Sequence, residues 1–227
     1  MSTLETARFE VKLTLPIHLE AYLSGWIGAH QLGFHTTYPQ RQVNNIYFDT
    51  YDLDAFAENL SGVAKRSKLR LRWYGEQQKV MNAQLELKQR CGKLGWKHSS
   101  PMNFTRELTQ LSWSALYSEV FNQASSRLKT QLLTCSIPSV LNSYTRNYWV
   151  SADNNLRITV DSNLCFYDQR ISSRLRRNNK TSITDTLVLE IKTLEKNRDL
   201  LKQTLQSIRL PLSRCSKYAI GIQSLAM

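Results

Sequence analysis

The sequence has 227 residues, of which 41% are hydrophobic and 21% charged, as in an ordinary folded protein. Thirty lysines and arginines against 18 acidic residues give a net charge of +12, which indicates an anionic partner such as nucleic acid, a membrane surface, a nucleotide or polyphosphate. No stretch reaches the ~20 apolar residues of a membrane span, and the first residues hold no apolar run like that of a secretory signal. We therefore expect a soluble, cytoplasmic protein with a single domain over residues 1–227.

The cysteines argue against two common kinds of site. Cys91, Cys135, Cys165 and Cys215 lie far apart in the sequence and form neither a CxxC pair nor a cluster with histidine. A zinc site is therefore not expected, and a chain of this length with four scattered cysteines is not a disulfide scaffold. The four histidines are scattered as well, and no Ser/His or Cys/His arrangement is evident.

The chain opens with a two-faced strand followed by a helix. Residues 8–15 alternate, with Arg8, Glu10 and Lys12 on one face and apolar side chains on the other. Pro16 then begins a helix, because proline is tolerated in a first turn, and apolar side chains recur after it at helical spacing.

The strongest pattern is the stretch KRSKLRLRWYG at 65–75. Arg66, Lys68, Arg70 and Arg72 occupy every second position, and apolar side chains fill the positions between them. Because successive side chains of a strand point to opposite faces, four cations share one face and an apolar strip forms the other.

Other strands repeat this design. Further strands are predicted at 42–50, 82–90, 143–150, 156–162 and 186–193, and a hairpin partner of the second of these at 93–102. Charged residues take alternate positions at Glu86, Lys88, Arg90, Arg146, Arg157, Asp161, Glu190 and Lys192. The total is about eight strands, mostly antiparallel.

The remaining segments are helical or irregular. A short turn is expected over 51–60, and a helical insertion at about 104–134. A basic polar loop at about 170–184 is the best candidate for local disorder. Helices are also expected to begin at Asn197 and near the C-terminus, over 216–225. Strands with helices at the start, middle and end predict one α+β domain.

Two arrangements of the strands can accommodate their charged faces. In a sandwich, the apolar faces meet in one core and the charged faces are solvated. In an eight-stranded antiparallel β-barrel with a charged lumen, the apolar faces lie outside beneath flanking helices, and the lumen admits a small ligand. Burying a net positive set without a counter-charge is very costly, so the barrel implies a polyanionic ligand with a metal and water.

Eight segments, taken in chain order, carry a resemblance to a known family. The sequence resembles the catalytic domain of the vacuolar transporter chaperone (VTC) polyphosphate polymerases, a branch of the triphosphate tunnel metalloenzyme superfamily. The matching segments are RFEVK (8–12), NNIYFDTYDLDAF (44–56), RSKLRLRWYG (66–75), LELKQR (85–90), SYTRNYW (143–149), LRITVD (156–161), LEIK (189–192) and SKYAIGI (216–222). Each segment alone is weak evidence for the family, but eight segments in the same order make the resemblance specific.

The resemblance implies an eight-stranded tunnel that holds a triphosphate along its axis. It places catalytic phosphate-binding cations at Lys12, Arg70, Arg72, Lys88, Arg146, Arg157 and Lys217. Further substrate-binding cations are expected at Arg8, Arg66, Lys68, Arg90 and Lys192. A divalent metal, Mn²⁺ or Mg²⁺, is implied on Glu190, with Glu86 and Glu10 as secondary ligands or as partners of the neighbouring lysines.

The implied reaction is transfer of the γ-phosphate of ATP to a growing polyphosphate chain, which needs positioning and charge neutralisation more than a covalent nucleophile. Triphosphatases of the superfamily usually carry ExExK on the first strand. Arg8 stands where the first glutamate would be, which favours transfer to phosphate over hydrolysis.

Two alternatives remain open. The first is an inorganic or nucleoside triphosphatase on the same fold, and the second is a non-catalytic module that binds polyphosphate or RNA. Aromatic residues do not interleave with the basic loop, so no specific nucleic acid partner is expected. Full-length eukaryotic relatives add a regulatory domain and membrane helices that this sequence does not show, so any coupling to a membrane would need a partner.

Overall fold

The computed structural model describes residues 8–75, 82–92, 94–208, 210, 213 and 215–226. Its strands are β1 (Arg8–Pro16), β2 (His35–Asp49), β3 (Lys65–Tyr74), β4 (Ala83–Cys91), β5 (Leu94–Met102), β6 (Ile137–Val150), β7 (Leu156–Asp168), β8 (Lys180–Ile183) and β9 (Thr186–Leu194). Its α-helices are α1 (Glu20–Gly28), α2 (Asp54–Ser61), α3 (Trp113–Gln123), α4 (Ser126–Thr134), α5 (Arg198–Ile208) and α6 (Lys217–Leu225). Short 3-10 helices are η1 (Ile17–Leu19), η2 (Leu108–Gln110) and η3 (Glu195–Asn197).

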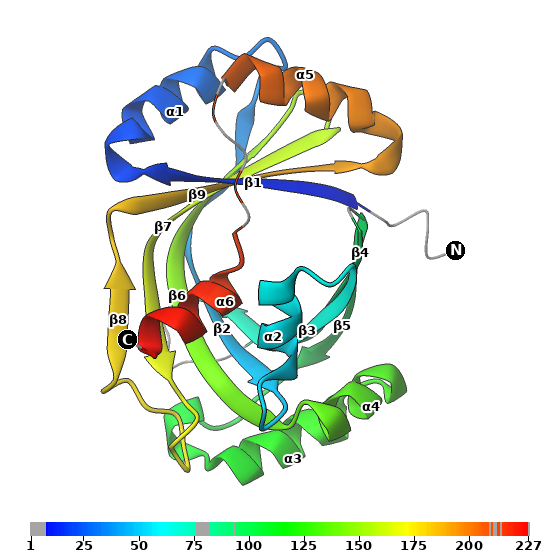
Figure 1. Ribbon diagram of the computed structural model, residues 1–227, viewed down its shortest axis with the longest axis vertical. Helices are drawn as coiled ribbons and strands as arrows, with labels where there is room; N and C mark the ends of the chain where they lie inside the picture. The colour runs from blue at the N-terminus through cyan, green and yellow to red at the C-terminus, as the bar shows by residue number, and fades with distance from the viewer. Residues whose placement is uncertain are drawn as a thin grey trace.

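Eight of these strands close into an antiparallel ring (Figure 1). The hydrogen-bonded order runs β6-β2-β3-β4-β5-β1-β9-β7, and a further pairing of β7 with β6 completes it. The predicted set of about eight antiparallel strands with flanking helices is thereby confirmed. The ninth strand, β8, pairs with the last part of β7 outside the ring. Because β8 lies inside 170–184, the expectation of a loop throughout that stretch was wrong.

Several elements are longer than their sequence pattern predicts. β2 begins at His35 and β6 at Ile137, because the two strands pair along almost their whole length, with register shifts that absorb the irregular positions. A helix, α2, replaces the turn expected over 51–60. The cause is Asp49, a buried carboxylate that accepts hydrogen bonds from the backbone N–H groups of Ala55 and Phe56.

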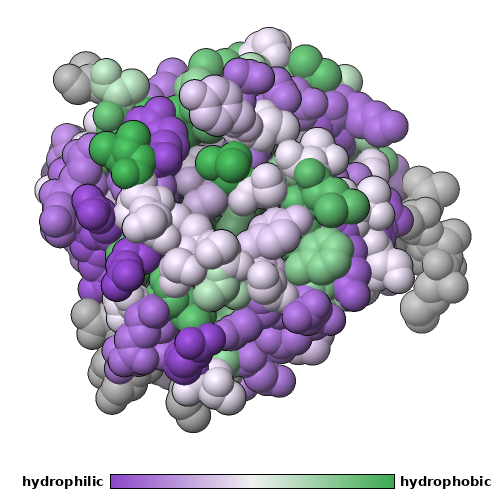
Figure 2. All heavy atoms as spheres, turned by 90° about the horizontal axis from the view of Figure 1, so that it is seen from below, coloured by the Kyte–Doolittle hydropathy of each residue, from purple (hydrophilic) through white to green (hydrophobic). Residues whose placement is uncertain are grey.

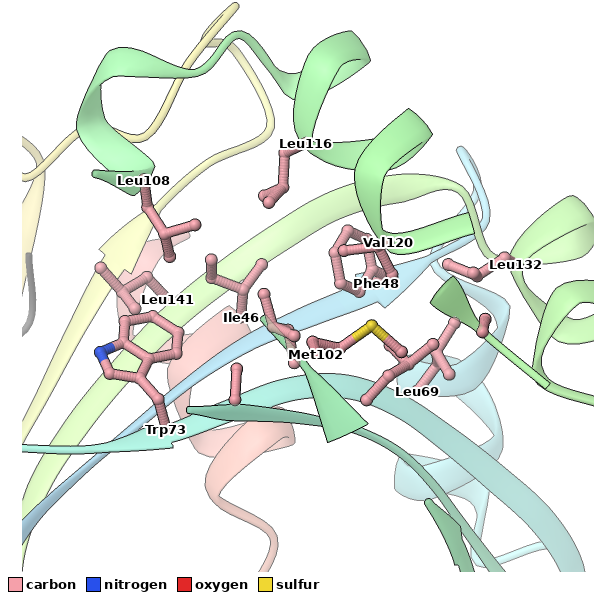
Figure 3. Packing of buried hydrophobic residues seen from close by; sticks show 14 of the residues in the cluster. Ile46, Phe48, Leu69, Trp73, Met102, Leu108, Leu116, Val120, Leu132 and Leu141 are labelled. Carbon is pink, nitrogen blue, oxygen red and sulfur yellow. The ribbon is translucent and has the colours of Figure 1, made fainter. Parts of the chain in front are cut away.

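The apolar faces of the strands lie outside the ring. Leu69, Leu71 and Trp73, which alternate with the cations of β3, are buried in the largest apolar cluster. Figure 3 shows side chains from β2, β3 and β6 meeting Leu116 and Val120 of α3, which close this cluster from outside. The helical insertion expected at 104–134 contains α3 and α4, which together cover one wall of the ring (Figure 1).

A second apolar cluster lies on the other side of the ring. It joins outward side chains of β1, β7 and β9 to Leu23 of α1 and Leu201 of α5. Figure 1 shows these two helices side by side over β1 and β9. The Tyr22 hydroxyl of α1 donates a hydrogen bond to the carbonyl of Ile208, the last residue of α5. The two outer apolar faces of the ring therefore have separate helical covers on opposite sides.

The C-terminal helix α6 packs against β6 and β7 and lies within the outline of the ring (Figure 1). Tyr218 stacks on Tyr47 of β2 with ring centroids 4.9 Å apart, and its hydroxyl donates a 2.5 Å hydrogen bond to Asp49. Asp49 thus joins the end of β2, the start of α2 and α6. Gly221 faces β7 so closely that a Cβ there would lie 2.6 Å from the ring of Phe166.

The outer surface carries both hydrophilic and hydrophobic residues (Figure 2). Figure 2, which views the molecule from below, shows hydrophilic residues over much of the margin with smaller hydrophobic areas between them. Within the ranges that the structure describes, no helix is both long and apolar enough to cross a membrane.

Replacing Gly221 by alanine should destabilise the protein by about 1–3 kcal/mol, because the new methyl group must displace the fully buried Phe166 ring. Thermal or urea unfolding measures the change. Gly25→Ala is the matched control, since it lies in α1 with no heavy atom within 4 Å of the added carbon, and it should be neutral or slightly stabilising. Equal stability of both variants would contradict the packing of α6 on β7.

Candidate active site

The ring encloses a cavity with about 460 Å³ of empty space, part of it open to solvent. Its lining is strongly basic. The lining residues are Lys12, Tyr47, Lys68, Arg70, Arg72, Lys88, Tyr144, Arg146, Glu190, Lys192, Ser216 and Lys217. Among the described residues of the lining, eight of twelve are cations and one is a carboxylate, so the cavity suits a small polyanion.

The arginines of β3 are held by a carboxylate on the neighbouring strand. Arg70 lies opposite Glu86 of β4 and donates to its Oε2 from Nε at 2.8 Å and from Nη2 at 2.7 Å. Arg72 approaches the same oxygen to 3.7 Å, while its Nε donates to Asn45 of β2 at 2.8 Å. The other oxygen of Glu86 accepts from Lys97 at 2.8 Å. Both guanidinium groups are therefore fixed before any ligand arrives.

Three lysines share Glu10 of β1. Its carboxylate lies 2.8 Å from Nζ of Lys12, 2.6 Å from that of Lys88 and 4.0 Å from that of Lys192. Lys192 in turn contacts Glu190 at 2.8 Å. The registers explain this meeting, because Glu10 pairs with Lys192 and Lys12 with Glu190 across β1 and β9.

A third group joins β6, β7 and α6. Arg146 donates to Asp161 in a bidentate pair, from Nε at 2.5 Å and from Nη2 at 2.7 Å, and Lys217 reaches the same carboxylate at 2.5 Å. Lys217 is the first residue of α6, and Ser216 is its N-cap, accepting from the N–H of Ala219. The Ser216 hydroxyl also accepts from Lys68 at 2.8 Å, so α6 completes the cavity wall.

The lysines of the cavity differ in their protonation. Burial opposes the charged form of Lys12, but Glu10 and Glu190 outweigh burial and raise its pKa. Burial lowers the pKa of Lys88 to about 7, because the attraction of Glu10 is offset by Lys12 and Lys192. Burial, with Lys12 and Lys88, also holds the pKa of Lys68 well below its usual value. The lowered pKa values of Lys68 and Lys88 therefore reduce the positive charge of the cavity near neutral pH.

The carboxylates in and behind the lining stay ionised. Burial would raise the pKa of Glu10 and Glu86, but the neighbouring cations reverse that effect and lower both. The pKa values of Asp161 and Glu190 are lowered in the same way. The eight basic lining residues outnumber these four carboxylates, and the lowered pKa values of Lys68 and Lys88 reduce the excess of positive charge that results.

The structure brings together most of the residues that the sequence indicates. The lining contains Lys12, Arg70, Arg72, Lys88, Arg146, Lys217, Lys68, Lys192 and Glu190, with Glu10 and Glu86 directly behind. Their functional roles stay predictions.

Four predicted basic residues are not part of this lining. Arg8 and Arg157 are exposed. Arg66 donates to the carbonyl of Val63, and Arg90 to that of Gly92. Arg157 shares a face of β7 with Thr159 and Asp161, but it is the second residue of the strand. The alternation of side chains along a strand thus predicts which face a residue is on, but not whether the residue reaches the cavity.

Sequence reasoning missed several members of the site. Tyr47 lines the cavity and accepts from Arg70 at 3.3 Å, and Tyr144 accepts from Arg72 at 3.4 Å. Tyr144 precedes Arg146 by two residues, so alternation alone predicts that they share a face. Ser216 could have been found as an N-cap residue, because it lies at the start of the predicted C-terminal helix.

The fit of a divalent metal rests on two carboxylates. Among the residues that the structure describes, no group of three His, Cys, Asp or Glu side chains is close enough to hold a metal. Glu10 and Glu190 converge on Lys192 and Lys12, and two carboxylates with phosphate and water oxygens make a usual magnesium site. These two residues fit a metal held jointly with a ligand. Both oxygens of Glu86 accept from Arg70 and Lys97, and both oxygens of Glu10 from Lys12 and Lys88, so a metal on Glu10 would have to displace one of these lysines.

Comparisons with solved structures give distant likenesses. The PH1819 protein from Pyrococcus horikoshii OT3 is 12% identical, over 94% of this chain and 95% of that chain, with a TM-score of 0.46. A proposed adenylate cyclase from Vibrio parahaemolyticus is 13% identical over 93% and 97%, with a TM-score of 0.48. A chain of the Schizosaccharomyces pombe Mediator head module is 12% identical over 91% and 97%, with a TM-score of 0.44. All three TM-scores are below 0.5, so these likenesses say nothing about function.

Comparison with curated proteins gives no match. A family model, in contrast, matches nearly the whole chain, over residues 7–226, and its description is the VTC domain. Every residue that lines the cavity falls within the match. The chain therefore belongs to the VTC domain family.

Proposed function

We propose that this protein is a metal-dependent phosphotransferase that moves the γ-phosphate of ATP to the end of a polyphosphate chain within the ring. The observation that carries the proposal is the convergence of eight cations, from five strands and α6, on one cavity. Membership of the VTC domain family supports a polyphosphate-related or triphosphate-binding enzyme. The excess of positive charge favours a ligand with several phosphates, because such a ligand supplies the missing counter-charge.

In the proposed reaction, a terminal oxygen of the polyphosphate acceptor attacks the γ-phosphorus of ATP. The new P–O bond forms as the bond between the γ-phosphorus and the β–γ bridging oxygen breaks, and ADP leaves with that electron pair. The acceptor oxygen is already anionic, so no general base is needed. Arg70, Arg72 and Arg146, each fixed by a carboxylate, supply oriented donors for charge on the transferred group.

Glu10 and Glu190 would hold the divalent metal together with phosphate oxygens. A bound Mg²⁺ or Mn²⁺ would supply charge neutralisation between the donor phosphates. The same two carboxylates keep Lys12 protonated, since their charges raise its pKa. The metal site and the lysine site therefore depend on the same acidic residues.

The pairing of the carboxylates bears on the triphosphatase alternative. Glu10, Glu86, Asp161 and Glu190 each contact at least two cations. A carboxylate held in this way is a weak base toward water, which favours transfer over hydrolysis. Incubating the protein with ATP and Mn²⁺ tests this: long chains on a gel support the polymerase, and free phosphate without chains would leave the triphosphatase in its place.

Glu190→Gln should reduce ATP turnover by about 100-fold or more, since the change removes a proposed anionic metal ligand, and leave tripolyphosphate binding within a few-fold of wild type, since the cavity loses a negative charge. Phosphate transfer assays and calorimetric titration measure the two effects. Glu119→Gln, on the surface of α3 beside Arg106, should change neither. Full turnover in Glu190→Gln would refute a metal role for that residue.

The protein should take up protons when it binds tripolyphosphate near pH 8. Lys88 has a pKa of about 7 in the free protein, and an anionic ligand raises that pKa, so affinity should fall as pH rises from 7 toward 9. Below pH 7, Lys88 is already charged and the dependence should flatten. Calorimetry in buffers of different ionisation enthalpy counts the protons.

Lys88→Arg should take up fewer protons than wild type, because arginine stays charged throughout this range. Lys65→Arg, at the exposed start of β3, is the matched control and should behave as wild type. Equal uptake in wild type and Lys88→Arg would show that another group carries the effect.

Lys68→Met should stabilise the ligand-free protein while weakening tripolyphosphate binding. Lys68 is half-buried beside Lys12, Lys88, Arg66 and Arg70, and burial and these cations hold its pKa well below the usual value. Methionine removes the free-energy cost of placing an amine in these surroundings. For a chain of this size, a gain of about 1 kcal/mol raises Tm by roughly 2–4 °C. Differential scanning fluorimetry and titration test both effects against Lys202→Met, an exposed change on α5. A lower Tm with unchanged affinity would contradict this expectation.

A further inference from the structure

A cluster of three tyrosines and one arginine, Tyr38, Arg41, Tyr74 and Tyr148, borders the cavity; we call it the mouth cluster. Tyr74 follows Arg72 by two residues on β3, and Tyr148 follows Arg146 by two residues on β6. Two residues along a strand span about 7 Å and return to the same face. The strand faces that line the cavity with arginine therefore continue into aromatic rings.

The cluster is organised around one guanidinium group. The Cζ of Arg41 lies 3.9 Å from the ring centroid of Tyr38 and 5.5 Å from those of Tyr74 and Tyr148. Tyr38 and Tyr148 meet edge to face at 5.5 Å. The guanidinium of Arg146, which lines the cavity, lies 6.0 Å from the Tyr148 ring. The rings are thus contiguous with the phosphate-binding cations.

The cluster is open to a ligand. The side chain of Tyr38 is 51% exposed and that of Tyr74 45%. In the part of the chain that the structure describes, no carboxylate lies within ion-pair distance of Arg41, and the buried hydroxyl of Tyr148 has no hydrogen-bond partner. β2 shifts register on both sides of Tyr38, and such bulges commonly redirect a side chain beside an active site.

We propose that the mouth cluster stacks against the base of a nucleoside triphosphate whose phosphates lie in the cavity. This inference rests on the proposed function and adds a binding site for the base of its nucleotide: a nucleoside triphosphate is bound more tightly than an inorganic triphosphate. Tyrosine faces and a guanidinium plane both stack on nucleobases, whereas a phosphate chain offers no such face. Stacking tolerates any base and grows with ring area, so purine nucleotides should bind best.

Calorimetric titration of the full chain with Mg-ATP and with Mg-tripolyphosphate tests this. Tyr38→Leu and Tyr74→Leu should each weaken ATP binding by about tenfold, the low end of one stacking contact, and leave tripolyphosphate binding within twofold. Tyr38→Trp keeps an aromatic face and should retain ATP binding. Tyr51→Leu, at a side chain 87% exposed and outside the cluster, should change neither affinity.

The outcomes separate the two proposals. Equal loss of ATP and tripolyphosphate binding in the leucine variants, or loss of neither, would overturn base stacking while leaving the phosphate site intact. Loss of ATP binding in Tyr38→Trp equal to that in Tyr38→Leu would overturn it as well. A wild-type protein that binds neither ligand would instead overturn the proposed function, and the inference with it. Thermal melts of each variant check that the fold is retained.

Discussion

Repulsion among eight cations that face one cavity is the constraint on which the rest of this structure depends. The protein meets it without forming simple pairs, because each of four carboxylates contacts two or three cations. Glu10 holds three lysines, and Asp161 joins a strand arginine to Lys217 of α6. Shared carboxylates fix the positions of the side chains while leaving a net positive charge for a ligand to neutralise.

The polar cavity leaves most apolar strand residues on the outside of the ring, where they need separate covers. α3 and α4 close one such cluster, and α1 and α5 close a second. α6 instead packs on a third cluster inside the ring, which includes Tyr47 and Tyr144 of the cavity lining. The last helix has two roles, since its first turn supplies Lys217 and its next residue binds Asp49 at the end of β2. The fold and the site are therefore connected through α6, and a change in its packing reaches the cavity.

Alternation predicted much of this from the sequence. In the second half of β3, Lys68, Arg70 and Arg72 alternate with Leu69, Leu71 and Trp73, and the structure places the two sets on opposite sides of the ring wall. Local patterns did not predict α2, because the carboxylate that caps it, Asp49, lies in a strand six residues before Ala55. The presence of Arg70 in the lining and the absence of Arg157 from it depend on how the strands pair around the ring, including the β6–β7 pairing that closes it, and no local pattern contains these long-range contacts.

The division between the two faces of each strand has a consequence for divergence within the family. On β3, Leu69, Leu71 and Trp73 support the fold from outside, while Arg70 and Arg72 meet the ligand from inside. Substitutions at the inner positions alter charge and shape without removing apolar packing, so stability and ligand choice can change independently. A new substrate would then require changes at even positions of this strand while its odd positions are conserved.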